Sequence, residues 1–384
     1  QDKTTQFAHE GDAYEAFCYH KYDDSARGFD NLYANLKKMG AELRTNTRLT
    51  EIMQNADGTV TGVKAEKEDG GVLTVHAKAV IIATGGFGGD VERVRRELKT
   101  PYLNFIGMPS MGEGLDAMLK AGAKDWDATP LLHGCQLAES TVAKESSSEQ
   151  LAGYSSSALT WLLQSPLLWV DGEGSRFVNE DVVYDTAFWA NAAYAAGGRY
   201  FIVTDQATLD SYTNGDTLRL SYSGPGPSKE GGNLTELAEL AVQGKTAWKG
   251  NTLSELASAA GFDEKDFSSS VERYNTMVSQ RNDTDYGKSA KSLRFGVSQG
   301  PFYAFDCRAV FLGTIGGVKV DEHLRVLDVE HYKPIPGLFA AGTSAGGYYA
   351  GRGYPPYEGL ACGFAWTSGR IAGESAASYA KSAK

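Results

Sequence analysis

Lys78-Ala-Val-Ile-Ile-Ala-Thr-Gly-Gly-Phe-Gly-Gly89 is the stretch that decides the fold of this chain. Its apolar residues form an unbroken run, which is typical of a parallel strand buried inside a sheet. The glycines that follow predict a tight loop, because glycine adopts backbone conformations that other residues avoid. The stretch therefore favours an α/β fold in which a buried parallel strand leads directly into a tight glycine loop.

Two other segments have the same character. Gly112-Glu-Gly114 and Ala341-Gly-Thr-Ser-Ala-Gly-Gly347 are also glycine-rich, and each follows a short apolar stretch. Backbone N–H groups in such loops bind anionic or carbonyl oxygens. One loop of this kind is usually an ordinary turn, whereas three in one chain favour a nucleotide cofactor.

The sequence around these loops predicts both helices and strands. Hydrophobic spacing indicates an amphipathic helix over residues 28–40, and alternating patterns indicate a small meander of strands over residues 41–77. Residues 317–321 and 337–342 are expected to be strands, and residues 359–379 a long glycine- and alanine-rich helix.

The bulk composition excludes several classes of function. With 384 residues the chain is long enough for two or three folding units. A formal net charge of −11 argues against a nucleic-acid partner, which needs an excess of Lys and Arg. The four cysteines are far apart and form no CxxC pair, so no metal site or disulfide framework is expected. No apolar run approaches the ~20 residues that cross a bilayer. The compartment stays open between the cytoplasm and an exported, cell-envelope-associated location.

Seven motifs occur in a fixed order along the chain. They are Asn46-Thr-Arg-Leu-Thr-Glu-Ile52, Ala83-Thr-Gly-Gly-Phe-Gly88, Gly112-Glu-Gly-Leu115, Gly174-Ser-Arg-Phe-Val-Asn-Glu180, Gly316-Gly-Val-Lys-Val-Asp321, Pro336-Gly-Leu-Phe-Ala-Ala-Gly342 and Gly369-Arg-Ile-Ala-Gly373. This series resembles the flavoproteins of the fumarate reductase and succinate dehydrogenase family, in the wide sense that includes 3-ketosteroid dehydrogenases. The resemblance covers nearly the whole chain and implies an FAD-dependent oxidoreductase that acts on CH–CH bonds.

The resemblance implies a Rossmann-like FAD-binding domain with an inserted α+β cap domain that binds substrate. The expected segments are residues 1–125 and 299–384 for the FAD-binding domain and residues 126–298 for the cap. The family begins with a strand and a GxGxxG loop that holds the FAD pyrophosphate. Since no such segment stands before residue 28, we expect a cut or processed start and an incomplete FAD-binding domain that binds FAD weakly or not at all. The absent segment is then a candidate partner as a separate chain.

The resemblance also places FAD along the sequence. The backbone of Leu49 is expected at the adenine, and Gly342 and Thr343 near the ribityl and pyrophosphate groups. The last helix would start at the pyrimidine edge of the flavin, where its positive end stabilises the anionic reduced flavin. The expected cofactor-binding residues are Leu49, Ala83, Thr84, Gly85, Gly86, Gly112, Glu113, Gly114, Gly342, Thr343, Gly359, Leu360 and Ala361.

Two positions depart from the fumarate-type enzymes. Those enzymes place an Arg proton donor after the Arg-Phe-x-Asn-Glu motif, where this chain has Tyr184. They also hold a substrate carboxylate with a His before Thr-x-Gly-Gly, where this chain has Gly313. Each lost charged hydrogen bond costs a dicarboxylate ~1.5–3 kcal/mol, which argues against fumarate as the substrate.

The same positions resemble the 3-ketosteroid dehydrogenases. These enzymes share a Tyr after the Arg-Phe-x-Asn-Glu motif, the segment Leu312-Gly-Thr-Ile-Gly-Gly317, and a motif like Arg352-Gly-Tyr354-Pro. Tyr354 and the N–H of Gly359 would donate hydrogen bonds to a ketone or enone oxygen. The motif that begins at Arg352 is one residue longer here than in the steroid enzymes. The second hydrogen-bond donor to the substrate oxygen is therefore either Gly359 or Glu358. Tyr184 would handle the proton, with Arg352 lowering its pKa.

Three functions remain open from the sequence. The leading hypothesis is an FAD-dependent oxidoreductase acting on a CH–CH bond next to a carbonyl, of the 3-ketosteroid dehydrogenase or enone reductase type. It would work on a steroid-like or other enone with an external electron donor or acceptor. Tyr348, Tyr349 and Tyr357 could form a flat wall for a polycyclic or phenolic substrate, or simply pack together. The second hypothesis is a reductase of an α,β-unsaturated acid, like fumarate or urocanate reductases, in which Arg352 and His133 bind the substrate carboxylate. The third is a non-catalytic fragment or subunit.

Overall fold

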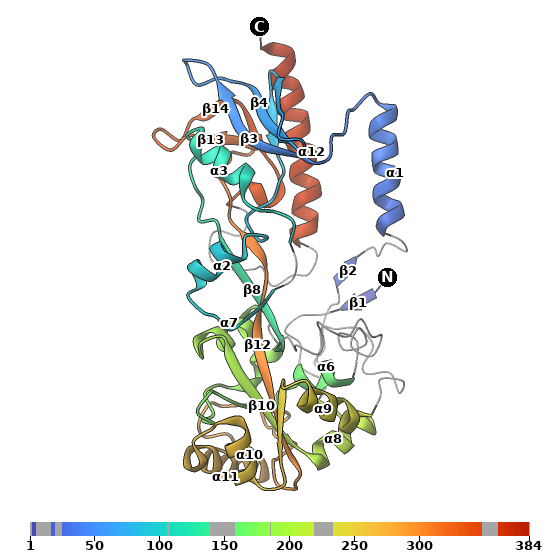
Figure 1. The fold of residues 1–384 in the computed structure, drawn as a ribbon, viewed down its shortest axis with the longest axis vertical. Coiled ribbons are helices and arrows are strands. Elements are labelled where there is room, and N and C mark those ends of the chain that lie inside the picture. The colour runs from blue at the N-terminus through green and yellow to red at the C-terminus, as the bar shows by residue number, and fades with distance from the viewer. Residues whose placement is uncertain are drawn as a thin grey trace.

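The molecule is a mixed α/β protein of two lobes joined by a narrow waist (Figure 1). The computed structural model describes residues 2–4, 17–19, 25–105, 108–138, 158–184, 186–218, 233–347 and 360–383. The glycine loops predicted to bind the cofactor belong to the upper lobe of Figure 1.

A three-stranded sheet forms the centre of the upper lobe. Strand β6 (Val80–Ile82) runs parallel to β14 (Pro334–Ala340), which also pairs with β13 (Arg325–Leu327). The parallel strand predicted from the sequence is therefore confirmed. The prediction that this strand is buried inside the sheet is wrong, because β6 is the edge strand among the described strands and Ile81 is 40% exposed.

The predicted meander packs beside this sheet. It consists of the antiparallel strands β3 (Thr47–Gln54), β4 (Val60–Lys67) and β5 (Val72–His76). The predicted N-terminal helix is α1 (Ser25–Lys38), which stands to one side of the upper lobe in Figure 1, and the C-terminal helix is α12 (Leu360–Ser382). Two short helices, α2 (Val91–Leu98) and α3 (Glu113–Lys120), follow β6 along the chain.

The lower lobe is an antiparallel sheet surrounded by helices. Its strand order is β11 (Ala247–Gly250), β12 (Phe302–Ile315), β10 (Arg199–Asp205) and β9 (Leu168–Val170). All residues of β9 and most of β10 and β12 are buried, so this sheet is the core of the lobe. The surrounding helices are α6 (Ala158–Leu163), α7 (Thr186–Ala195), α8 (Gln206–Thr213), α9 (Leu234–Gln243), α10 (Leu253–Ala260) and α11 (Glu264–Gln280).

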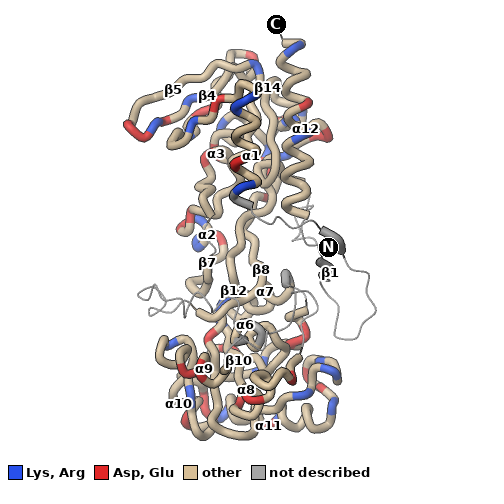
Figure 2. The backbone as a smooth tube through the Cα atoms, turned by 90° about the vertical axis from the view of Figure 1, so that its right-hand side faces the viewer, with Lys and Arg blue, Asp and Glu red and all other residues tan. Residues whose placement is uncertain are grey.

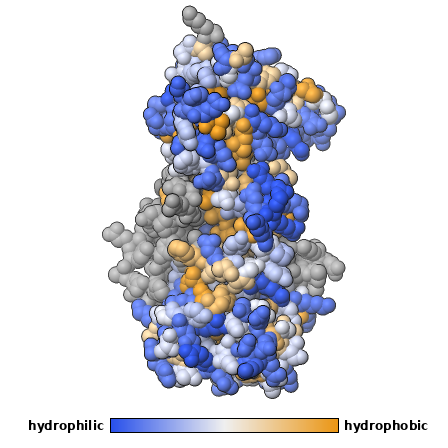
Figure 3. Space-filling model, turned by 90° about the vertical axis from the view of Figure 1, so that its left-hand side faces the viewer, coloured by the Kyte–Doolittle hydropathy of each residue, from blue (hydrophilic) through white to orange (hydrophobic). Residues whose placement is uncertain are grey.

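The waist consists of strands that continue from one lobe into the other. β12 has 14 residues, and its first half pairs with β10 and β11 in the lower lobe. Its second half pairs with β8 (Thr129–Leu137) and β7 (Leu103–Phe105), with register shifts near Phe311. Figure 3 shows the narrowing between the lobes and the apolar residues on its surface. The sequence analysis did not predict β8 or β12.

The strand predicted over residues 317–321 is wrong. Val318 and Val320 form only isolated bridges, to Asp125, Ala345 and Val326. Gly316 and Gly317 have φ angles of 89° and 127°, which interrupt the extended conformation after β12.

Charged residues of both signs are interspersed over both lobes (Figure 2). In the described part of the chain, no helix is both long and apolar enough to span a bilayer.

Candidate flavin site

Two adjoining cavities lie among the glycine loops of the upper lobe. The first, which we call the inner cavity, has a volume of about 230 Å³ and lies between the loop after β6, the upper ends of β8 and β12, the loop after β14 and the first turns of α12. The second, the outer cavity, has a volume of about 680 Å³ and is lined mainly by β3, β4 and the start of α3. Ser110 lines both cavities, so the two are direct neighbours.

Glycines are required at the inner cavity because the backbone segments around it approach one another closely. A Cβ atom on Gly86 would overlap the side chain of Thr314, and one on Gly85 would lie 2.7 Å from Ser110 Oγ. Gly85 and Gly342 also have φ angles of 77° and 59°, in the left-handed region that favours glycine. The loop predicted to bind a cofactor is therefore closely packed against the strand that carries Thr314.

Two buried serines connect the elements around the inner cavity. The Oγ of Ser344 accepts a hydrogen bond from the Gly85 N–H at 3.1 Å and lies 3.2 Å from the Gly85 carbonyl, to which it donates. The Oγ of Ser368, in α12, accepts from the Gly342 N–H at 2.9 Å. These bonds hold the loop after β6, the loop after β14 and α12 in one arrangement.

The outer cavity is more polar than the inner one. Leu49 supplies an apolar surface there, while Thr84 and Glu113 contribute oxygen atoms. Glu113 also pairs with the exposed Arg48 at 3.5 Å. An adenine ring against Leu49 and ribose hydroxyls near the oxygen atoms would suit this surface.

The residues at the two cavities fit FAD. The inner cavity offers a largely apolar space bounded by glycine residues, which suits the apolar faces of an isoalloxazine ring. The positive end of α12 lies at the same cavity, since Ala361 and Phe364 line it. A Cβ on Gly114 would overlap Thr84, so glycine at this position lets α3 begin directly beside the end of β6.

Most of the predicted cofactor residues described by the structure lie at this site. Leu49, Thr84 and Glu113 line the outer cavity. The residues that line the inner cavity are Gly85, Gly86, Gly342, Thr343 and Ala361. Ala83, Gly112, Gly114 and Leu360 belong to the same loops and helix starts but line neither cavity.

The predicted catalytic residues are not brought together in the described part of the chain. Tyr184 ends the short 3-10 helix η2 (Glu180–Tyr184), is buried in the core and does not line the inner cavity. His133 lies in β8, is half-buried and does not line it either. Burial lowers the pKa of His133, which disfavours the charged imidazolium that would attract a carboxylate. Arg352, Tyr354 and Gly359 lie outside the described residues, as do Tyr348, Tyr349, Tyr357 and Glu358.

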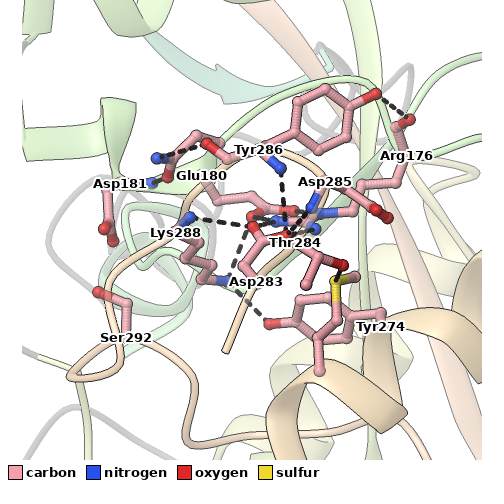
Figure 4. A network of polar contacts seen from close by, with 12 residues as sticks. Arg176, Glu180, Asp181, Tyr274, Asp283, Thr284, Asp285, Tyr286, Lys288 and Ser292 are labelled. Atoms are coloured by element: carbon pink, nitrogen blue, oxygen red, sulfur yellow. Dashed lines mark hydrogen bonds and ion pairs between the residues drawn. The ribbon is translucent and has the colours of Figure 1, made fainter. Parts of the chain in front are cut away.

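A buried network of charges holds the turn that carries Tyr184 (Figure 4). The Arg176 guanidinium donates to Glu180 Oε1 and Oε2 at 2.8 and 2.7 Å, and to Asp283 Oδ1 and Oδ2 at 3.1 and 2.7 Å. Lys288 Nζ lies 3.3 Å from Glu180 Oε2 and donates to the Tyr274 hydroxyl at 2.8 Å. Two cations and two carboxylates balance each other, which satisfies charges that would be costly to bury alone.

The sequence analysis missed several residues at the inner cavity. Thr314, which lines the cavity, and Ser344, which holds the Gly85 loop beside it, stand inside motifs that were recognised, but their contacts with distant residues carry no local sequence signal. Met108 and Ser110 stand in a segment without any motif and line the cavity through the fold alone.

Comparison with known proteins identifies the family. A family described as "FAD binding domain" matches residues 21–354. The vinyl phenol reductase of Lactiplantibacillus plantarum is 31% identical over 361 residues, which cover 91% of this chain and 71% of that protein. A cytochrome-type fumarate reductase of Shewanella frigidimarina is also 31% identical, over 91% of this chain and 54% of that protein. The chain thus spans about half the length of this second relative.

A solved structure shares the fold. The 3-ketosteroid delta1-dehydrogenase of Sterolibacterium denitrificans superimposes with a TM-score of 0.58 at 21% identity, over 92% of this chain and 62% of that one. The family match, the two relatives and the fit of the cavities to FAD agree with the resemblance seen in the sequence. This chain therefore belongs to the FAD-binding domain family of flavoprotein oxidoreductases, and its cofactor is FAD.

Proposed function

We propose that this protein transfers hydrogen at a C=C bond conjugated to an uncharged, oxygen-bearing group, as enone reductases and 3-ketosteroid dehydrogenases do. One observation carries the proposal: among the described residues that line the inner cavity, none has a charged side chain. Burying a carboxylate without a paired cation is costly, whereas a neutral conjugated ring only loses contact with water.

The relatives support this substrate class in part. One relative is named for vinyl phenol, a neutral aryl alkene whose C=C bond is conjugated through the ring to a phenolic oxygen. Another is named for fumarate, a dicarboxylate, and favours the alternative of an unsaturated acid bound by Arg352 and His133. The lowered pKa of His133, caused by burial, disfavours this alternative at neutral pH.

The proposed roles of the residues follow the polarisation of the substrate. When bound, reduced FAD would supply hydride chemistry to the double bond. Tyr354 and the Gly359 N–H would donate to the substrate oxygen and stabilise the charge that develops there. Tyr184 would deliver a proton to the other carbon, and would remove it in dehydrogenation. Since Tyr184 is buried at the end of η2 and does not line the inner cavity, this role requires that Tyr184 and the substrate approach each other during the reaction.

The wider organisation is also a proposal. We place the FAD-binding domain in residues 1–125 and 299–384 and the cap in residues 126–298. The open edge of β6, within the part of the chain the structure describes, supports an incomplete Rossmann-like sheet that a further strand would extend. An external electron donor or acceptor completes the reaction.

A comparison of substrates tests the proposed function. The FAD-saturated protein, with reduced viologen as the electron donor, is offered a cyclic enone, a vinylphenol and an acrylate in parallel. We expect turnover of at least one neutral substrate with a kcat/KM well above that of the acrylate. A higher kcat/KM for the acrylate would show instead that the protein is a reductase of an unsaturated acid.

Substitution of the two tyrosines tests their roles. Tyr184→Phe and Tyr354→Phe should each lower kcat by about 10²–10⁴-fold, because a proton donor or an oxygen-binding hydroxyl is lost. FAD content should not change. Tyr332→Phe is the matched control, since Tyr332 is 50% exposed and lies away from the cavities. Full activity in both test variants would exclude the assigned roles.

A further inference from the structure

Gly313 differs from every other described glycine that lines the inner cavity. The others have either a left-handed φ angle, as Gly85, Gly316, Gly342 and Gly347 do, or a tight contact that a Cβ atom would make, as Gly86, Gly88 and Gly346 do. Gly313 has neither feature. A Cβ atom there would meet only Met108 Cε, at the ordinary van der Waals distance of 3.7 Å.

The backbone at this position therefore does not require glycine. Gly313 lies in β12 opposite Leu131 of β8, in an extended strand that any residue could occupy. Because Gly313 lines the cavity, the missing side chain leaves open space in the cavity itself. The glycine thus affects what the cavity can hold and not how the strand folds.

The surroundings of this space define the chemistry of its occupant. Met108 Cε faces it at 3.7 Å, and Leu131 and Leu312 line the same cavity. The thioether of Met108 makes favourable contacts with aromatic rings and adapts to their shape. A flat, uncharged ring would fill the gap between the β12 backbone and Met108, whereas a small acyclic alkene would leave it partly empty.

We propose that Gly313 is a specificity-determining residue that admits a flat, uncharged ring of the substrate between β12 and Met108. This inference rests on the proposed function, which supplies the conjugated alkene, and adds the position that selects its size. Side chains at position 313 would reduce the space for a ring in proportion to their volume. They would spare a substrate that does not reach this part of the cavity.

The test is a series of variants assayed with excess FAD against two neutral substrates, a vinylphenol and methyl vinyl ketone. Gly313→Ala should lower kcat/KM for the ring substrate about 10-fold and Gly313→Leu about 100-fold or more, since one methylene in an apolar pocket is worth that order of discrimination. The value for methyl vinyl ketone should change less than about 3-fold. Gly363→Ala is the matched control, because a Cβ there meets nothing within 4 Å and Gly363 lies on the exposed face of α12.

A binding measurement separates this inference from the proposed function. Calorimetry with ethylphenol, the reduced product of vinylphenol, reports whether the ring fits independently of turnover, and Gly313→Leu should abolish the binding seen in the unmodified protein. Unchanged ethylphenol binding in Gly313→Leu, or an equal loss of activity with both substrates, would overturn the role of Gly313. If the unmodified protein reduces neither substrate but binds ethylphenol in a Gly313-dependent way, the proposed reaction fails and the ring site stands.

Discussion

A single hydroxyl, that of Ser344, connects the two glycine loops that border the inner cavity. It is buried and exchanges hydrogen bonds with both the N–H and the carbonyl of Gly85. Removing it leaves these two backbone groups without their partner, at about 1–3 kcal/mol. If the Gly85 loop borders the flavin, as the fit of the inner cavity indicates, Ser344→Ala should weaken FAD binding by about 5- to 100-fold, measured by titration of flavin fluorescence.

A matched serine serves as the control for this prediction. Ser279 lies on the exposed face of α11, where its hydroxyl donates to the Thr276 carbonyl at 2.7 Å. Ser279→Ala should leave the FAD affinity unchanged. Equal affinities in Ser344→Ala and in the unmodified protein would show that the loop keeps its position without the hydroxyl.

At the scale of elements, the buried network of Arg176, Glu180, Asp283 and Lys288 joins the turn that carries Tyr184 to the loop after α11. Asp283→Asn would leave two buried cations, Arg176 and Lys288, with Glu180 as their one carboxylate in the network, and losing one partner of such a network typically costs about 3–5 kcal/mol of folding free energy. Asp285→Asn is the control, because Asp285 pairs with Arg273, whose side chain is 63% exposed, and surface pairs contribute about 0–1 kcal/mol. Chemical denaturation of both variants checks the prediction, and similar losses in the two would contradict it.

The same network predicts an acid-sensitive stability. Burial alone would raise the pKa of Asp283, but hydrogen bonds from Arg176 and from the N–H groups of Lys288, Asp285 and Tyr286 lower it below its ordinary value. A carboxyl whose pKa is lower in the folded state stabilises the fold above its unfolded pKa of about 3.9, and this contribution disappears as the pH falls toward the folded pKa. The unfolding free energy of the unmodified protein should therefore decline below about pH 4 more steeply than that of Asp283→Asn. If the unfolding free energies of the two proteins fall equally steeply with decreasing pH, Asp283 does not cause the acid sensitivity.

The elements also show what the sequence could and could not predict. The loop after β6, the meander and the last helix were predicted because glycines, turn residues and periodicity are local signals. β12 was missed because its first half is buried in the lower sheet and its second half pairs across the waist with β8, so no single alternation runs along it. Tyr184 was predicted from a motif, whereas its burial in the hydrophobic core depends on contacts with distant segments.

At the scale of the whole molecule, the open edge of β6 bears on how firmly the protein holds its cofactor. β6 pairs only with β14 among the described strands, and the β1–β2 pair (Asp2–Thr4 and Phe17–Tyr19) is separate from this sheet. A dinucleotide site of the Rossmann type places the pyrophosphate at a loop and helix N-terminus that follow a strand of the same sheet. A strand added along β6 would bring such a loop next to the Gly85 loop and the inner cavity.

We therefore predict that these 384 residues alone bind FAD weakly, without retaining a stoichiometric amount through purification. Visible flavin absorbance together with intact mass measures the retained fraction. A version extended at its N-terminus by a strand-GxGxxG-helix segment should retain more FAD, because the N–H groups of that segment would bind the pyrophosphate. The extension should also protect the backbone amides of β6 from hydrogen exchange, since an edge strand becomes a central one. Stoichiometric FAD in the unextended protein would mean that the loops after β6 and β14 and the start of α12 are sufficient to bind the cofactor.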